Sequence, residues 1–310
     1  MLLANEWSEY KIIATGNGEK LEDWNGVKLL RPDPQIIWPG NSDLARYKGL
    51  NARYVRSETG GGMWETVAQK GSAPQKMPEE WNIHYKDLTF KIKPTGFKHT
   101  GLFPEQAANW DIMRALIQTE KGKRSEPVKI LNLFAYTGGA TVAVAKEGAL
   151  VTHVDAAKGM VERAKLNCQL SKVSERCTRW IVEDCRRFIE REQRRGQTYD
   201  AVIMDPPSYG RAPGGEVWKL EDNLFGLVEL CASILSQNPL FFLLNSYTTG
   251  LQASVMKNII NAVVLKGRGG RTKAYELCLP TEEENILLPC GNSALWVGDP
   301  MHPAFSKIEG

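Results

Sequence analysis

The chain lacks the patterns that hold metal ions or disulfides. It has six cysteines and four histidines, but no two cysteines are spaced CxxC and no histidines are spaced HExxH. We therefore expect no metal site and no disulfide framework. This cysteine usage fits a reducing, cytoplasmic compartment best.

Long hydrophobic runs and a targeting leader are also missing. The longest apolar stretches, such as LFFLL at 240–244, are far shorter than a membrane span requires. The N-terminal MLLANEWSEYKII has no basic segment followed by a long apolar core, so we expect neither a signal peptide nor a membrane partner. The 310 residues suit one large and one smaller domain, and the net charge of +3 permits a nucleic-acid partner without indicating one.

Composition changes twice along the chain. Residues 1–95 are rich in Trp, Gly and Pro, and strand-like pieces at 27–30 and 87–93 lie between turn signals, which predicts a small β-rich domain. Residues 96–127 form a connecting segment, in which the pattern of 104–122 predicts a helix.

From 128 to 310, short apolar runs alternate regularly with helical patterns. VKILNLF, ALVTHVD, TRWIVED, YDAVIMD and PLFFLLN are typical of buried strands, while KAYELCLP and ENILLPCG predict an antiparallel edge pair. The alternation predicts an α/β fold, a Rossmann-like doubly wound and mostly parallel sheet with an antiparallel edge strand. Such sheets bind ligands at the carboxyl ends of their strands.

The ends of the first two predicted strands have features that are typical of nucleotide-binding sites. NLFAYTGG (132–139) has two glycines that either let the backbone approach a ligand or simply make a strand-to-helix turn. It is not the GxGxxG fingerprint, which disfavours a nicotinamide-dependent oxidoreductase. Asp155, 17 residues after Gly138, is placed either to accept hydrogen bonds from ribose hydroxyls or to cap the next helix.

The third strand end carries two acids. Glu183 or Asp184 could accept from the exocyclic amine of an adenine, with the Cys185 backbone beside it. Asp184 equally suits the N-cap of the following helix, and both roles are compatible.

The fourth strand ends in MDPPSYGR (204–211). Pro206 and Pro207 donate no hydrogen bond, whereas the Asp205 carboxylate and the carbonyls that precede the prolines accept, which favours a substrate amino group. Tyr209 could stack on a flat ring, and Arg211 could hold a phosphate.

Together these motifs resemble class I S-adenosylmethionine-dependent methyltransferases, in particular the bacterial group related to the large-subunit rRNA methyltransferases that carry a DPPS(F/Y) motif. GFKHTGLFPEQ (96–106) is similar to that group's TGxFxDQR element, although Glu105 replaces the acid and Ala107 the arginine. The resemblance implies that residues 96–127, with their helix, cover the bound cofactor. The resemblance covers roughly residues 95–250. Residues 1–95 do not resemble the PUA-type RNA-binding module of that group.

The resemblance implies roles for individual residues. The catalytic centre would comprise Asp205, Pro206, Ser208 and Tyr209. The cofactor, S-adenosylmethionine, would be bound by Thr100, Phe103, Gln106, Phe134, Tyr136, Thr137, Gly138, Asp155, Glu183, Asp184, Cys185 and Asp205.

The position of the cysteines bears on the chemistry. In group members that make 5-methylcytosine, a nucleophilic thiol follows the fifth strand, but here that place reads LLNSYTTG (243–250). We expect Cys231 to be a core residue. The sequence therefore favours direct in-line transfer of a methyl group to a base nitrogen, with oxygen as the second choice of acceptor. Ser208, however, stands where amino-methylases have an aromatic residue.

We expect the acceptor to be RNA, in particular rRNA. Lys266, Arg268 and Arg271 in KGRGGRTK, together with Arg211, are candidate phosphate contacts, although such a segment is also typical of a solvated turn. A methyltransferase for a protein or small molecule is the alternative, since no dedicated RNA-binding module is evident. A non-catalytic nucleic-acid-binding protein would predict degraded strand-end motifs, and these are intact.

Overall fold

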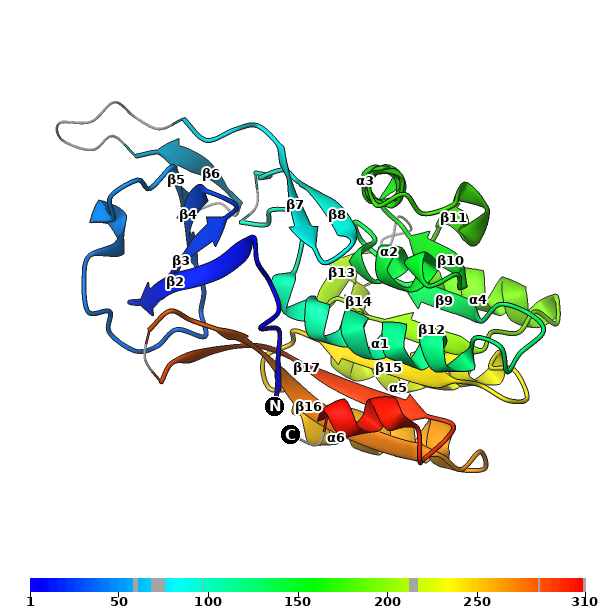
Figure 1. Ribbon diagram of the computed structural model, residues 1–310. Helices are drawn as coiled ribbons and strands as arrows, with labels where there is room; N and C mark the ends of the chain where they lie inside the picture. The colour runs from blue at the N-terminus through cyan, green and yellow to red at the C-terminus, as the bar shows by residue number, and fades with distance from the viewer. Residues whose placement is uncertain (58–60, 68–75, 97, 212–216, 284, 309–310) are drawn as a thin grey trace. The chain divides into compact units, whose positions relative to one another are not determined.

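The structure is a computed structural model, which divides into two units (Figure 1). The β-rich unit comprises residues 3–107 and 278–290, and the α/β unit comprises residues 1–2, 108–277 and 291–310. Residues described are 1–57, 61–67, 76–96, 98–211, 217–283 and 285–308, without the side chains of Arg211, Ser306 and Lys307.

Short strands with tight turns build the β-rich unit. One sheet contains, in spatial order, β2 (Tyr10–Gly16), β3 (Glu19–Trp24), β4 (Val27–Pro32), β5 (Ala52–Arg56) and β6 (Gly62–Thr66). A separate hairpin is formed by β7 (Trp81–Tyr85) and β8 (Leu88–Ile92), and 3₁₀ turns occur at Leu44–Arg46 and Pro104–Gln106. The predicted β-rich start is confirmed.

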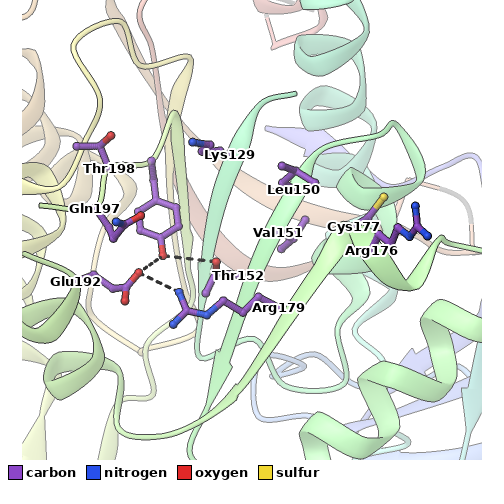
Figure 2. A pocket seen from close by; sticks show the side chains of 11 residues that line it. Lys129, Leu150, Val151, Thr152, Arg176, Cys177, Arg179, Glu192, Gln197 and Thr198 are labelled. Atoms are coloured by element: carbon purple, nitrogen blue, oxygen red, sulfur yellow. Dashed lines mark hydrogen bonds and ion pairs between the residues drawn. The ribbon is translucent and has the colours of Figure 1, made fainter. Parts of the chain in front are cut away.

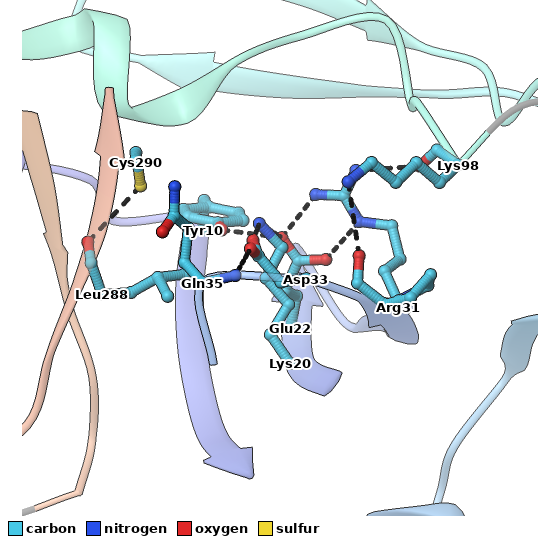
Figure 3. Close-up of polar contacts among 10 residues, drawn as sticks. Tyr10, Lys20, Glu22, Arg31, Asp33, Gln35, Lys98, Leu288 and Cys290 are labelled. Atoms are coloured by element: carbon cyan, nitrogen blue, oxygen red, sulfur yellow. Dashed lines mark hydrogen bonds and ion pairs between the residues drawn. The ribbon is translucent and has the colours of Figure 1, made fainter. Parts of the chain in front are cut away.

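A buried ion pair lies within this unit (Figure 3). Arg31 donates two hydrogen bonds to the Glu22 carboxylate, at 2.5 and 2.6 Å, and the Tyr10 hydroxyl donates a third at 2.8 Å. Burial alone would raise the pKa of Glu22, but Arg31 and Lys20 together lower it. The carboxylate therefore stays ionised, and loss of Arg31 would remove the closest ion-pair partner of a buried charge.

The α/β unit is built on an eight-stranded sheet. Its strands in spatial order are β1 (Leu2–Leu3), β16 (Arg271–Pro280), β17 (Leu287–Val297), β15 (Phe241–Ser246), β12 (Ala201–Met204), β9 (Lys129–Leu133), β10 (Leu150–Asp155) and β11 (Thr178–Val182). A small hairpin pairs β13 (Tyr209–Arg211) with β14 (Val217–Lys219). The helices are α1 (Ala107–Glu120), α2 (Gly139–Lys146), α3 (Lys158–Leu170), α4 (Cys185–Arg194), α5 (Leu220–Ser233) and α6 (Ala253–Ile260), followed by a π turn (Asn261–Leu265) and 3₁₀ turns at Glu175–Cys177 and Pro303–Ile308.

Helices cover both faces of this sheet (Figure 1). Apolar residues of β9, β12 and β15 pack with α4, α5 and α6 in one continuous core, whereas α1 and α2 contact the opposite face. The neighbouring strands β15, β12, β9, β10 and β11 pair in parallel, whereas β17 pairs with β15 in the antiparallel direction. The strand order reverses between β9 and β12, and ligands of such sheets bind at this switch point.

The predicted alternation of strands and helices is confirmed, with differences in detail. The helix expected over 104–122 is a 3₁₀ turn followed by α1, as Figure 1 shows for α1. The pattern VWKLEDNLFGLVELCASILS (217–236) predicts a helix from Val217 onward, but Val217–Lys219 is instead strand β14, in keeping with its β-branched and aromatic residues. β17 is antiparallel as predicted, but β16 and β1 lie between it and the sheet edge.

Both glycines at the start of α2 are required by packing. Gly138 has a φ of 80°, and a Cβ there would lie 2.7 Å from the Ala164 Cβ on α3. A Cβ at Gly139 would lie 2.7 Å from the Trp110 ring on α1. The Gly-Gly pair thus lets α1 and α3 approach the start of α2, a constraint that holds whether or not a ligand is bound.

We predict that Gly139→Ala destabilises the α/β unit, because the new methyl group would displace the Trp110 ring. Overpacking of this kind costs roughly 1–3 kcal/mol. Urea unfolding measures the change. Gly159→Ala, in a helix where a Cβ meets nothing within 4 Å, is the matched control and should be neutral or slightly stabilising. Equal stabilities for the two variants would contradict the packing argument.

Candidate functional site

A row of functional side chains crosses the carboxyl edge of the parallel strands at the switch point. One row of paired residues is formed by Val154, Leu133, Met204 and Leu244. The next residues on the same strands are, in the same order, Asp155, Phe134, Asp205 and Asn245. The register therefore brings three predicted site residues together and adds Asn245.

The loop after β9 has a strained backbone that its neighbours fix. Phe134 and Tyr136 have φ values of 54° and 50°, in a region that costs non-glycine residues of order 1–3 kcal/mol each. The Asp155 carboxylate accepts from the Tyr136 N–H at 2.8 Å, and the Cys185 thiol accepts from the Phe134 N–H at 3.3 Å. Asn167 holds the Thr137 carbonyl at 2.9 Å. Hydrogen bonds therefore fix the backbone of this loop, and two of the residues that hold it, Asp155 and Cys185, are themselves predicted cofactor residues.

Asp155 retains the capacity to bind hydroxyl groups. Its second oxygen accepts from the Ala157 N–H at 2.8 Å, so each oxygen has one backbone partner and a further lone pair. Val182 pairs with Asp155 in the sheet and is 50% exposed, which places apolar surface beside the acid. Acceptors next to apolar surface fit the ribose and adenine of an adenosine. Sequence reasoning missed Val182, although an apolar residue directly before the acid pair was the available signal.

The acids after β11 make structural contacts. Asp184 caps α4 by accepting from the Arg187 N–H at 3.0 Å, which confirms the capping alternative. Glu183 forms an ion pair with Arg191 at 2.5 Å. Their contact with an adenine stays a prediction.

No described thiol is poised for nucleophilic attack at this edge. Cys185 is buried, and burial raises its pKa well above the ordinary value. Cys231 lies in the core, as predicted, where burial also raises the pKa. Because the thiolate is the attacking form, both side chains are inert at neutral pH.

Asp205 directly follows β12, and the prolines after it lead into the β13–β14 hairpin. The Ser208 hydroxyl hydrogen-bonds to Thr248 at 2.7 Å, which links the loops after β12 and β15. Tyr209 is 55% exposed, and its ring is therefore open to a partner. The Arg211 side chain lies outside the described part of the chain.

Trp218 is a further contact of the proline motif that the sequence did not indicate. Its indole N–H donates to the Pro207 carbonyl at 2.6 Å, and its ring centre lies 6.0 Å from that of Phe134. This hydrogen bond ties the β13–β14 hairpin to the proline motif. The sequence pattern placed Trp218 inside the expected helix, so it gave no signal for this contact.

The predicted residues of the TGLFPEQ segment belong to the β-rich unit. Thr100 is buried, the Phe103 ring lies 5.5 Å from the His99 ring, and the Gln106 N–H bonds the Phe103 carbonyl at 3.1 Å. Their contact with a cofactor remains a prediction.

The basic segment 266–273 lies near the amino ends of the strands. The Gly269 carbonyl accepts from the Trp296 indole at 2.8 Å, and Trp296 pairs with Phe242 near the start of β15. The segment is thus at the opposite edge from Asp205.

Two of its cations have partners there. Arg268 donates to the Ala232 carbonyl at 2.9 Å, and the Arg271 guanidinium lies 5.4 Å from the Phe305 ring centre. Lys266 is exposed. Phosphate contacts of these residues remain a prediction, and at this edge they would lie away from the reacting atoms.

A pocket of about 250 Å³ also lies at the amino edge (Figure 2). Lys129, Leu150 and Arg179, from the starts of three strands, help to line it. Within it, Glu192 accepts from the Tyr199 hydroxyl at 2.8 Å and from Arg179 at 3.1 Å. Its position separates it from the row at the carboxyl edge.

Within the described residues, no cluster of His, Cys, Asp and Glu could hold a metal ion. Among the same residues, no helix has the length and apolarity to cross a membrane.

The buried His153 takes part in hydrogen bonds that connect the strands next to the site. Thr141 Oγ1 accepts from the Asn132 amide at 2.9 Å and lies 2.9 Å from His153 Nδ1. Burial lowers the pKa of His153 to about 3, so the ring is neutral at physiological pH. These three residues join β9, α2 and β10. Asn132 and His153 lie two residues before Phe134 and Asp155 in the chain.

The fold and this edge define a doubly wound α/β protein with a nucleotide-type cofactor site. A family model described as S-adenosylmethionine-dependent methyltransferase matches residues 71–222. A solved S-adenosylmethionine-dependent methyltransferase from Agrobacterium tumefaciens is 32% identical with a TM-score of 0.86, and the match covers 96% of this chain and 93% of that one. The chain belongs to the S-adenosylmethionine-dependent methyltransferases, and S-adenosylmethionine is its cofactor.

Curated relatives match only a part of their own length. The ribosomal RNA large subunit methyltransferase K/L of Syntrophotalea carbinolica is 28% identical over 58% of this chain and 24% of that protein. The protein of the same name from Magnetococcus marinus is 37% identical over 40% of this chain and 16% of that protein. The chain thus spans a quarter or less of the length of these relatives.

We predict a pH-dependent stability that depends on His153. With a pKa of about 3 when folded and about 6.5 when unfolded, the unfolded chain binds the proton preferentially below pH 6.5. The stabilising contribution is complete above that pH and is lost progressively down to about pH 3. Between pH 7 and 5, the loss should be about 2 kcal/mol. Urea titrations should show a pH dependence smaller by that amount in His153→Gln, and unchanged dependence would contradict the burial argument.

We also predict that Asp155→Ala weakens binding of S-adenosylhomocysteine roughly 10- to 100-fold, because a charged acceptor for the ribose hydroxyls is lost. Isothermal titration calorimetry measures this change. Asp222→Ala, at an exposed position on α5, is the control and should bind as the wild type does. Wild-type affinity in Asp155→Ala would remove Asp155 from the cofactor site.

Proposed function

We propose that the protein methylates a base nitrogen in RNA, in particular rRNA, by direct in-line transfer from S-adenosylmethionine with Asp205 orienting the acceptor. The observation that carries this proposal is the position of Asp205 in the row at the switch point, between Phe134 and Asn245. The relatives named as rRNA methyltransferases support an RNA acceptor.

The mechanism needs positioning and one acceptor group. Bound S-adenosylmethionine supplies an electrophilic methyl carbon on a sulfonium. The Asp205 carboxylate accepts a hydrogen bond from the base N–H and aims the nitrogen lone pair at that carbon, within roughly 3–3.5 Å. The new N–C bond forms as the C–S bond breaks and its electron pair passes to sulfur. The proton leaves the nitrogen to Asp205 or to solvent.

The placement of the thiols favours nitrogen over a pyrimidine carbon. Carbon-5 of a pyrimidine becomes nucleophilic only after a thiolate adds to the ring. Cys185 is buried and occupied by the Phe134 N–H, and the segment after β15 has Asn245, Ser246 and Tyr247 in place of a cysteine.

Mass spectrometry of rRNA nucleosides from a deletion strain tests the function. We expect one methylated nucleoside to disappear and to return on complementation with the wild-type chain. Asp205→Ala should not restore it, since loss of a positioned proton acceptor lowers turnover roughly 10²- to 10⁴-fold. Binding of S-adenosylhomocysteine by Asp205→Ala should stay within a few fold of the wild type.

Two results would contradict the proposal. An unchanged nucleoside profile would redirect the search to protein or small-molecule acceptors. Restoration by Asp205→Ala would show that the catalytic centre lies elsewhere.

A further inference from the structure

A chain of buried hydrogen bonds ends at Asn245. The Tyr275 hydroxyl donates to Asn109 Oδ1 at 2.8 Å, and the Asn109 amide donates to Ser293 Oγ at 3.1 Å. The Ser293 hydroxyl donates in turn to Asn245 Oδ1 at 2.7 Å. Asn245 is only 2% exposed, and its amide nitrogen has no hydrogen-bond partner among the described residues.

The direction of this chain determines which group Asn245 presents. If every bond ran the other way, the buried Tyr275 hydroxyl hydrogen would lack an acceptor in the described residues, and Asn245 would still have one unused atom. The observed direction leaves one unpartnered group rather than two, and each such group costs about 1–3 kcal/mol. Asn245 therefore presents a donor, the N–H₂ group.

The site around this donor is the carboxyl edge of the sheet. Met204 pairs with Leu244, so Asp205 and Asn245 occupy the same level on neighbouring parallel strands. Along the row, Asn245 lies beyond Asp205 as seen from Asp155, whose surroundings fit the adenosine. Buried donors without partners are rare in folded proteins, and one at this position points to the substrate.

We propose that Asn245 is a substrate-positioning residue, whose amide N–H₂ donates a hydrogen bond to a carbonyl oxygen or ring nitrogen of the methylated base. The assignment rests on the proposed RNA function. Asp205 then accepts from the base, and Asn245 donates to it. A base that offers a donor at this position is rejected, because it would leave the Asn245 amide unpaired.

The test measures transfer of a tritiated methyl group from S-adenosylmethionine to rRNA purified from the deletion strain. Asn245→Asp keeps the shape and replaces the donor with an acceptor, so we expect kcat/KM to fall roughly 10- to 100-fold. S-adenosylhomocysteine affinity should stay within about threefold. Asn238→Asp makes the same change at an exposed position and should retain wild-type kcat/KM.

Tyr275→Phe provides a second, remote variant. Without its hydroxyl hydrogen the chain can run in either direction, so the Asn245 amide is no longer held with its donor toward the substrate. We expect a severalfold fall in kcat/KM with unchanged cofactor affinity, which a merely structural role of Asn245 would not produce.

The outcomes distinguish failure of the Asn245 assignment from failure of the proposed RNA function. If the wild type labels rRNA and Asn245→Asp labels it equally well, the Asn245 assignment is wrong while the proposed function stands. If cofactor affinity falls in parallel with turnover, the donor serves the cofactor and the substrate role is wrong. If the wild type labels no rRNA, the proposed function fails and the assignment fails with it.

Discussion

The Asp155 carboxylate is the interaction on which the carboxyl edge depends. One oxygen accepts from the Tyr136 N–H and the other from the Ala157 N–H, so a single side chain ties the loop after β9 to the loop after β10. The left-handed backbone at Phe134 and Tyr136 would otherwise relax. Each oxygen keeps a further lone pair, so the carboxylate that holds the loop is also the group for which we predict contact with ribose hydroxyls.

The two faces of the parallel sheet have different tasks. On the face toward α4, α5 and α6, the core is continuous and apolar, and its burial stabilises the unit. On the other face, buried polar residues such as Asn132, His153 and Asn245 make specific hydrogen bonds to neighbouring elements. Such polar chains fix orientation, because each donor and acceptor must be matched. The chemistry at the edge depends on the polar face.

Much of this arrangement could be predicted from the sequence. Alternating strand and helix patterns are strong local signals, and parallel pairing brings the ends of the strands to one edge, which is why Asp155 and Asp205 could be placed there from the sequence. The role of Trp218 could not be foreseen, because its partner Pro207 is set by a hairpin of only three residues per strand. The packing reason for Gly139 was equally hidden, because it depends on Trp110 from a different helix. Asn245 appeared only as the absence of a cysteine, since its role depends on the distant Ser293.

The division of the chain into units has a consequence for synthesis on the ribosome. The β-rich unit includes residues 278–290, and its Ile12 pairs with Thr281 while Glu283 accepts two hydrogen bonds from Thr15. Thr15 and Glu283 are 268 residues apart, so the contacts between these segments form only after the intervening residues have been synthesised. Until then β2 is paired with β3 on one side and lacks these contacts.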